Sequence, residues 1–187
     1  MDSDKHLQQK SKIGFPTLLL LVAIASGGMA MGWPGNASAD EVDCASILLK
    51  VSEPGYDTSC ETNGGVQVTT DVLEANATDG THFMVIFDLR TNHRYIFPGK
   101  SSLREDLNDL FSDSSIDDWR SGRAQQGLKT AEFSSEFKSI PSDCVGFQHF
   151  SGKQIGGWRR YIFGFGCSRT GDREQVYAAL RYVNFPD

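Results

Sequence analysis

The sequence has no continuous block of basic residues, and its 24 acidic side chains outnumber its 18 lysines and arginines. The net charge of −6 repels the phosphates of nucleic acids and of anionic lipids, so we expect no nucleic-acid binding. Proline is scarce as well, with 6 residues against 19 glycines, a balance that indicates many turns rather than disorder. Membrane contact is expected only through the N-terminal segment, if that segment stays uncleaved.

Signatures of catalysis and of cofactor binding are also missing. No C-x-x-C pair is present, and the histidine nearest in sequence to any cysteine is His149, so neither a metal site nor a cofactor is expected. No G-x-S-x-G pattern presents a nucleophilic serine. Gly99–Ser101 resembles the end of a P-loop, but Arg94 stands where that loop needs its first glycine. We therefore interpret Gly99–Ser101 as a turn before a helix.

The N-terminal segment has the order of a secretory signal peptide. The first residues include three lysines and precede the apolar run Phe15–Ala25, and small residues follow this run up to Ala39. This order predicts cleavage after Ala39 or, alternatively, after Ala30.

An uncleaved anchor is the alternative, because residues 15–33 are uncharged and nearly long enough to span a bilayer. In both cases the basic start stays in the cytoplasm. Residues 1–39 are thus expected to be a signal peptide or N-terminal membrane anchor. Residues 40–187 are expected to form a single exported domain. Its location would be periplasmic or secreted, or attached to the outer side of the inner membrane.

All four cysteines follow this segment, and their even number in an exported chain predicts two disulfides. Four cysteines permit three pairings. We favour Cys44–Cys60 and Cys144–Cys167, the second because its two cysteines can face each other across a hairpin.

That hairpin is predicted from strands Cys144–Phe150 and Arg160–Cys167, joined by a turn that contains Gly152, Gly156 and Gly157. Placing Cys144 opposite Cys167 sets the other pairs, namely Gly146 with Phe165, Gln148 with Phe163 and Phe150 with Tyr161. One face then carries both cysteines and the rings Phe150, Tyr161, Phe163 and Phe165, with large rings covering Gly146. The other face carries Val145, Phe147, His149 and Ile162.

Further elements follow from periodicity and capping. Strands are expected at Val66–Leu73, Thr81–Arg90, His93–Phe97 and Leu128–Ile140. One helix begins with the capping box Ser102–Glu105 and runs to about Phe111, and a second runs from Asp172 to about Val183. Cys44–Val51 is either a short helix capped by Asp43 or an edge strand, and Ser112–Gln126 is expected to be an exposed loop. The whole predicts an α+β fold, a mostly antiparallel sheet of about five to six strands with two helices on one face, held by disulfides.

The C-terminal part carries one resemblance. Its motifs are Cys144, Val145 and Phe147, then Gly157, Arg160 and Tyr161, then Gly164, Gly166 and Cys167 before an amphipathic helix. In this order they resemble small uncharacterised exported proteins of Gram-negative bacteria with a C-terminal paired-cysteine hairpin. The resemblance covers residues 144–187 and implies export and a structural role for the cysteines, but no activity.

The turn of the same hairpin holds a local positive cluster, which we interpret as a candidate binding site. Its residues are Lys153, Trp158, Arg159 and Arg160. Tryptophan and arginine are enriched at binding hot spots, and the flanking glycines allow the turn to adapt. The alternative is that Trp158 covers the sheet edge while the arginines pair with acids of Ser112–Asp118.

Two functions remain open from the sequence. The first is an exported binding or envelope-associated module, whose partner is an unidentified protein or small ligand of the cell envelope. The second is a small exported hydrolase using His149 or His93 with a nearby acid. A histidine within hydrogen-bond reach of a serine or carboxylate in a deep pocket would favour the hydrolase.

Overall fold

The computed structural model describes residues 39–65, 67–92, 96, 102–111, 115–137 and 140–185, with only the backbone for residue 137. Residues 1–38 of the N-terminal segment, the turn at Gly99–Ser101 and the expected strand His93–Phe97, except Ile96, lie outside these residues.

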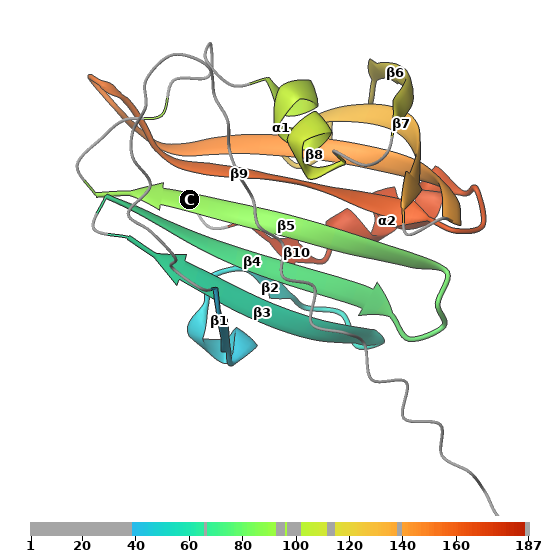
Figure 1. Cartoon of the computed structure of the whole chain (residues 1–187), viewed down its shortest axis with the longest axis horizontal. Helices are drawn as coiled ribbons and strands as arrows, with labels where there is room; N and C mark the ends of the chain where they lie inside the picture. Colours follow the sequence, from blue (N-terminus) through green and yellow to red (C-terminus); the bar gives the residue numbers. More distant parts are fainter. Residues whose placement is uncertain are drawn as a thin grey trace, which may run out of the picture.

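An antiparallel sheet of eight strands forms the body of the protein (Figure 1). From one edge to the other its order is β1-β3-β4-β5-β9-β8-β7-β6. The strands are β1 (Asp40–Val42), β3 (Tyr56–Gly64), β4 (Val68–Ala77), β5 (His82–Thr91), β6 (Ile116–Ser121), β7 (Lys129–Phe137), β8 (Ile140–Gln154) and β9 (Gly157–Ser168). A separate pair is formed by β2 (Lys50–Val51) and β10 (Val183–Asn184).

Two α-helices lie on opposite faces of the large sheet (Figure 1). Helix α1 (Leu103–Leu110) has the expected capping box, and its Leu103 and Leu107 belong to the core of one face. Helix α2 (Arg173–Leu180) starts at the cap Asp172 and contributes Val176, Ala179 and Leu180 to the core of the other face. We call these the α1 face and the α2 face.

The expected fold class is therefore wrong. The sheet has eight strands with a further pair beside it, and the two helices do not share a face. The expected loop Ser112–Gln126 contains the edge strand β6, and polar β1 and β3 extend the opposite edge. Edge strands need only one bonded neighbour and often carry charge, so their sequences resemble loops.

The hairpin register, by contrast, is confirmed. Cys144 lies opposite Cys167, and the pairs Gly146–Phe165, Gln148–Phe163 and Phe150–Tyr161 follow as expected. The two disulfides are Cys44–Cys60 and Cys144–Cys167. Gly146 is covered by Leu107 as well as by a ring, because a Cβ there would lie 2.7 Å from Leu107 Cδ1 and 3.4 Å from Phe133 Cε1.

Strand β5 is confirmed as the central strand, since Phe83–Asp88 are all buried. Its two neighbours in the sheet are β4 and β9. Cys44–Val51 contains both expected elements, a 3₁₀ helix (Cys44–Ser46) capped by Asp43 and the short strand β2.

Two disulfides are consistent with a location outside the cytoplasm. Among the residues that the structure describes, no helix is long and apolar enough to cross a membrane.

Close packing at Gly164 gives a first prediction. A Cβ on this residue would lie 2.2 Å from the Val85 carbonyl oxygen and 2.9 Å from Phe147 Cζ, and a backbone atom between paired strands cannot move aside. We expect Gly164→Ala to lower the free energy of unfolding by at least about 2 kcal/mol in urea titrations. Gly64→Ala is the matched control, because a Cβ there meets no atom within 4 Å. Equal stability of the two variants would contradict this account of the β5–β9 contact.

Candidate partner-binding site at the hairpin tip

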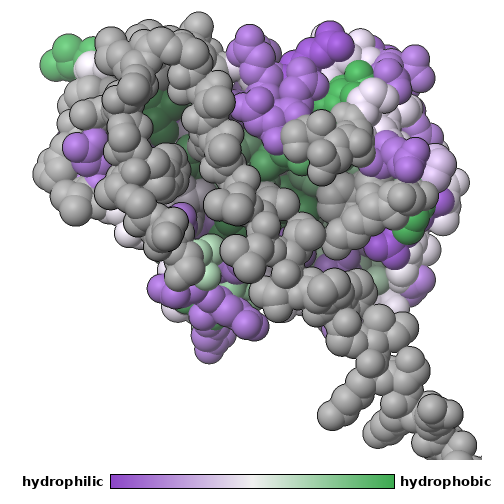
Figure 2. Space-filling model, viewed as in Figure 1, coloured by the Kyte–Doolittle hydropathy of each residue, from purple (hydrophilic) through white to green (hydrophobic). Residues whose placement is uncertain are grey.

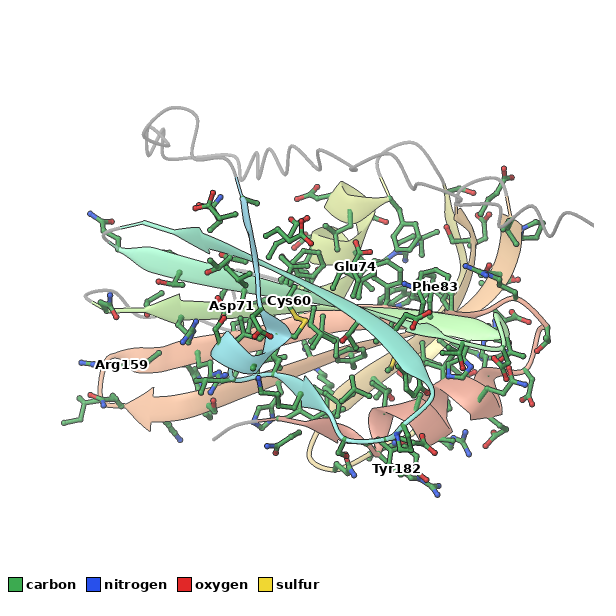
Figure 3. The ribbon with its side chains drawn as sticks, turned by 90° about the horizontal axis from the view of Figure 1, so that it is seen from below. Cys60, Asp71, Glu74, Phe83, Arg159 and Tyr182 are labelled. Atoms are coloured by element: carbon green, nitrogen blue, oxygen red, sulfur yellow. A yellow bond between two sulfur atoms is a disulfide. The ribbon has the colours of Figure 1, made fainter. Side chains whose placement is uncertain are left out.

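The tip of the β8–β9 hairpin extends beyond its neighbouring strands. Pairing of β7 with β8 ends at Gln148, and pairing of β5 with β9 ends at Arg160. The hairpin itself continues to the pair Gln154–Gly157. Beyond the end of β5, Ile96 exchanges two backbone hydrogen bonds with Trp158, at 2.7 and 3.1 Å. Figure 3 shows Arg159 at this projecting end of the sheet.

Arg160 belongs to the base of this projection. It is 7 % exposed and donates to both carboxylate oxygens of Asp88, from Nε at 2.8 Å and from Nη2 at 2.5 Å. Asp88 has no exposed surface, and Arg90 Nε lies 3.7 Å from its Oδ2 atom. Arg90 also forms an ion pair with the buried Asp71. Arg160, one of the four expected contact residues, is therefore held in a buried ion-pair network.

Trp158 is half-buried at the edge of a row of rings. Its ring centroid lies 6.0 Å from that of Phe150, and Lys153 Nζ lies 5.8 Å from the Trp158 centroid. The row continues by parallel stacking from Phe150 to Tyr161 at 4.5 Å, to Phe163 at 5.0 Å and to Phe87 at 5.0 Å. Packing is therefore part of the role of Trp158, while its remaining surface lies beside the Lys153 ammonium group.

The outer end of the tip presents a fully exposed isoleucine, Ile155. Lys153 and Arg159 are exposed on either side of the turn. Figure 2 shows an apolar patch at the end of the molecule where Figure 1 places this tip. Sequence reasoning named the turn but passed over Ile155, although an isoleucine followed by two glycines was a visible signal.

His82 is the histidine with the most defined surroundings in the described residues. Its Nε2 lies 2.7 Å from Tyr56 Oη, and its Nδ1 lies 2.9 Å from Thr81 Oγ1. Thr81 Oγ1 also donates to Asp79 Oδ1 at 2.8 Å. Because the Thr81 hydroxyl proton is donated to Asp79, Thr81 Oγ1 can only accept a hydrogen bond from the His82 ring. The proton of the neutral ring therefore lies on Nδ1, and Nε2 accepts a hydrogen bond from the Tyr56 hydroxyl. Tyr56 comes from the distant strand β3, so sequence spacing gave no signal for this contact.

The environment keeps this chain of hydrogen bonds in one protonation state near neutral pH. Burial lowers the pKa of His82, although Asp79 and Glu53 partly oppose the shift. Burial, with the negative charges of Glu53 and Asp79, raises the pKa of Tyr56 to about 12. His82 is therefore neutral and Tyr56 protonated. His149 is half-buried on β8, and His93 lies outside the described residues.

Comparison with protein-family models gives no match, and neither a curated protein nor a solved structure matches the chain. The resemblance to exported Gram-negative proteins stays an expectation, and the site has to be judged on its own geometry.

The buried ion pair at the base of the tip gives a second prediction. Asp88→Asn removes the negative charge that pairs with the buried Arg160 guanidinium, so we expect a loss of about 3 kcal/mol in the free energy of unfolding. Arg120→Gln breaks the exposed pair with Glu132 and should cost less than about 1 kcal/mol.

A double variant sharpens this test. Asp88→Asn combined with Arg160→Met removes both charges, so it should be more stable than Asp88→Asn alone. If the double variant is the less stable of the two, the cost does not come from an unpaired buried charge.

His82 gives a third prediction, on pH dependence. Between the lowered pKa of the folded protein and the ordinary value of 6.5, the unfolded chain binds more protons than the folded one. Stability contributed by His82 is therefore complete above pH 6.5 and is lost as the pH falls through this window. His82→Gln should flatten this part of the stability–pH curve, and the His82 ring protons should titrate below 6.5 by NMR. A midpoint at or above 6.5 would exclude the proposed desolvation.

Proposed function

We infer that this chain is an exported, disulfide-containing binding protein of the cell envelope, and that the tip of the β8–β9 hairpin contacts its partner. One observation carries this proposal: a fully exposed isoleucine, Ile155, stands at the end of a projecting hairpin whose base is locked by buried contacts. A side chain presented from an ordered base loses little conformational freedom on binding.

The charge of the tip indicates the kind of partner. Residues 149–161 contain Lys153, Arg159 and Arg160 but no acidic residue, whereas the chain as a whole carries a net charge of −6. Arg160 is paired with the buried Asp88, whereas the side chains of Lys153 and Arg159 are exposed at the outer surface. A partner with a negatively charged surface and an apolar depression for Ile155 fits this arrangement.

Export is supported by two independent features of the chain. The N-terminal order of charged, apolar and small residues is typical of a signal peptide. The two disulfides fit an oxidising compartment. We propose a periplasmic or secreted location, as expected for the exported Gram-negative proteins that residues 144–187 resemble, or attachment to the outer side of the inner membrane.

The hydrolase alternative named His149 or His93 with a nearby acid. His93 lies outside the described residues, and within them the His149 ring makes no hydrogen bond to a serine or carboxylate. His82 is the other histidine that the structure describes. A general base needs a ring nitrogen free to take a proton from the nucleophile. Both ring nitrogens of His82 are engaged, one with Tyr56 and the other with Thr81, whose own proton is directed to Asp79. The ring lies at the β4–β5 turn, next to the fully exposed Asp79. This arrangement supports a structural role.

Site-specific photo-crosslinking in the native compartment tests the proposal. A benzoyl-phenylalanine at Ile155 should give a discrete adduct, because this position would lie in the contact. The same residue at Ile140, an exposed isoleucine at the opposite end of β8, is the matched control and should give none. Lys153→Gln with Arg159→Gln should weaken the Ile155 adduct severalfold.

Folding is controlled in the same experiment. Ile155→Ser should leave the melting temperature unchanged within about 1 °C, because a fully exposed side chain contributes no burial. Equal adducts from both positions, or an Ile155 adduct that is insensitive to the charge changes, would overturn the assignment of the tip as the contact surface.

A further inference from the structure

A second surface, remote from the hairpin tip, is hollowed between β2, β10, the turn after α2 and the turn before β7. The hollow has a volume of about 550 Å³. Its lining residues are Lys50, Ser52, Gln126, Arg181, Tyr182, Val183, Asn184 and Phe185. Small-molecule sites in proteins commonly have volumes of this size. Figure 3 shows Tyr182 beside α2 and β2, well apart from Arg159 at the hairpin tip.

Hydrogen bonds join the three chain segments that line this hollow, which are residues 50–52, Gln126 and residues 181–185. Ser52 donates from its backbone N–H and from its hydroxyl to the Tyr182 carbonyl oxygen, both at 2.9 Å. Gln126 donates from Nε2 to the Arg181 carbonyl oxygen at 3.3 Å. Lys50 Nζ donates to the Cys44 carbonyl oxygen, beside the Cys44–Cys60 disulfide. The walls are therefore joined by hydrogen bonds from both backbone and side-chain donors.

The lining has a charge opposite to that of the chain. Among the residues that the structure describes, the lining contains two cations, Lys50 and Arg181, and no carboxylate, although the chain as a whole is acidic. The acidic residue nearest in sequence, Glu53, follows Ser52 but is not part of the lining. The Asn184 amide and the second N–H of the Gln126 amide add hydrogen-bond donors around the cations, whereas the hydroxyl proton of Ser52 is committed to Tyr182. This combination selects an anionic group such as a phosphate or carboxylate.

Two rings supply the apolar part of the lining. Tyr182 is 41 % exposed, so its ring is accessible from solvent. Phe185 is half-buried, with its ring 5.9 Å from that of Phe147 in an edge-on arrangement. A flat apolar body can lie against these rings while its anionic group meets the cations.

The turn that carries Gln126 is strained. Gln126 and Gly127 both have positive φ angles, +48° and +75°, between the bridged residues Gln125 and Leu128. Glycine accepts such angles freely, and asparagine or aspartate is usual at the first position. Glutamine there costs stability, and strain of this kind is often kept where a side chain has a role at a site. Here its longer side chain reaches the hollow.

We propose that this hollow is a binding site for a small anionic molecule with a flat apolar or aromatic body, an aryl phosphate or aryl carboxylate in chemical class. Arg181 and Lys50 hold the anionic group, and Tyr182 with Phe185 contacts the ring. The site is independent of the hairpin tip, so failure of either assignment leaves the other standing.

Calorimetric titration of the oxidised chain with phenyl phosphate tests this site, with inorganic phosphate and phenol as the two fragments. We expect saturable binding of phenyl phosphate, at least about tenfold tighter than that of either fragment, because only the whole probe engages cations and rings together. Benzoate, titrated in parallel, decides between phosphate and carboxylate as the preferred group.

Arg181→Gln should weaken phenyl phosphate binding about tenfold, and Tyr182→Leu should remove the advantage of phenyl phosphate over inorganic phosphate. Both side chains are exposed, so the melting temperature should stay within about 2 °C of that of the unaltered chain. Lys129→Gln removes an exposed cation outside the hollow and should leave binding unchanged. No saturable binding of either aryl probe, or equal losses in Arg181→Gln and Lys129→Gln, would overturn the proposal.

Discussion

The register between β8 and β9 is the constraint on which the rest of the structure depends. Side chains alternate between the two faces of a strand, so a slip of one residue would move Tyr161, Phe163 and Phe165 from the α1 face to the α2 face. The Cys144–Cys167 disulfide joins directly opposed residues and so permits one register. β5 pairs with β9 from His82 to Arg90 and inherits this register, as does β4 through β5.

The same alternation explains why the two helices separate. On β5, β9 and β8 most of the buried residues on each face are apolar, so both faces of the sheet need to be covered. The α1 face carries mainly rings, and Leu107 of α1 packs where Gly146 leaves space. The α2 face is more aliphatic, and a Cβ on Gly166 would lie 2.6 Å from Val176 Cγ1 of α2. Each helix thus packs over a glycine in the hairpin, one on each face.

Local patterns were enough to predict the hairpin, both disulfides, the Ser102 cap and the central strand. The outer strands could not be predicted in this way, because β1, β3 and β6 are polar and gain their strand conformation from bonds to a neighbour. The predicted α+β fold was wrong because it missed these outer strands and placed both helices on one face of the sheet. Which face a helix covers is decided by three-dimensional packing and not by its local sequence. At the candidate tip, Arg160 looked like a surface cation because its partner Asp88 lies 72 residues away in sequence. Asp88 itself looked like the end of an apolar run.

The ion pair also bears on how the tip is presented. A buried pair of opposite charges is often no more stabilising than two apolar residues of equal volume, so stability alone does not explain Arg160 and Asp88. A slip of β9 by one residue would carry Arg160 from the α2 face to the α1 face and break its ion pair with Asp88. The disulfide and the ion pair therefore specify the register at two separate places along one hairpin. Tyr161 and Phe163 lie between the disulfide and the ion pair and pack on the α1 face, whereas Arg160 pairs with Asp88 on the α2 face. β9 is therefore held on both of its faces as far as Arg160. Ile155 is thereby carried on a strand pair that has little freedom to twist or slide, which is the condition under which one exposed side chain can contribute to specific binding.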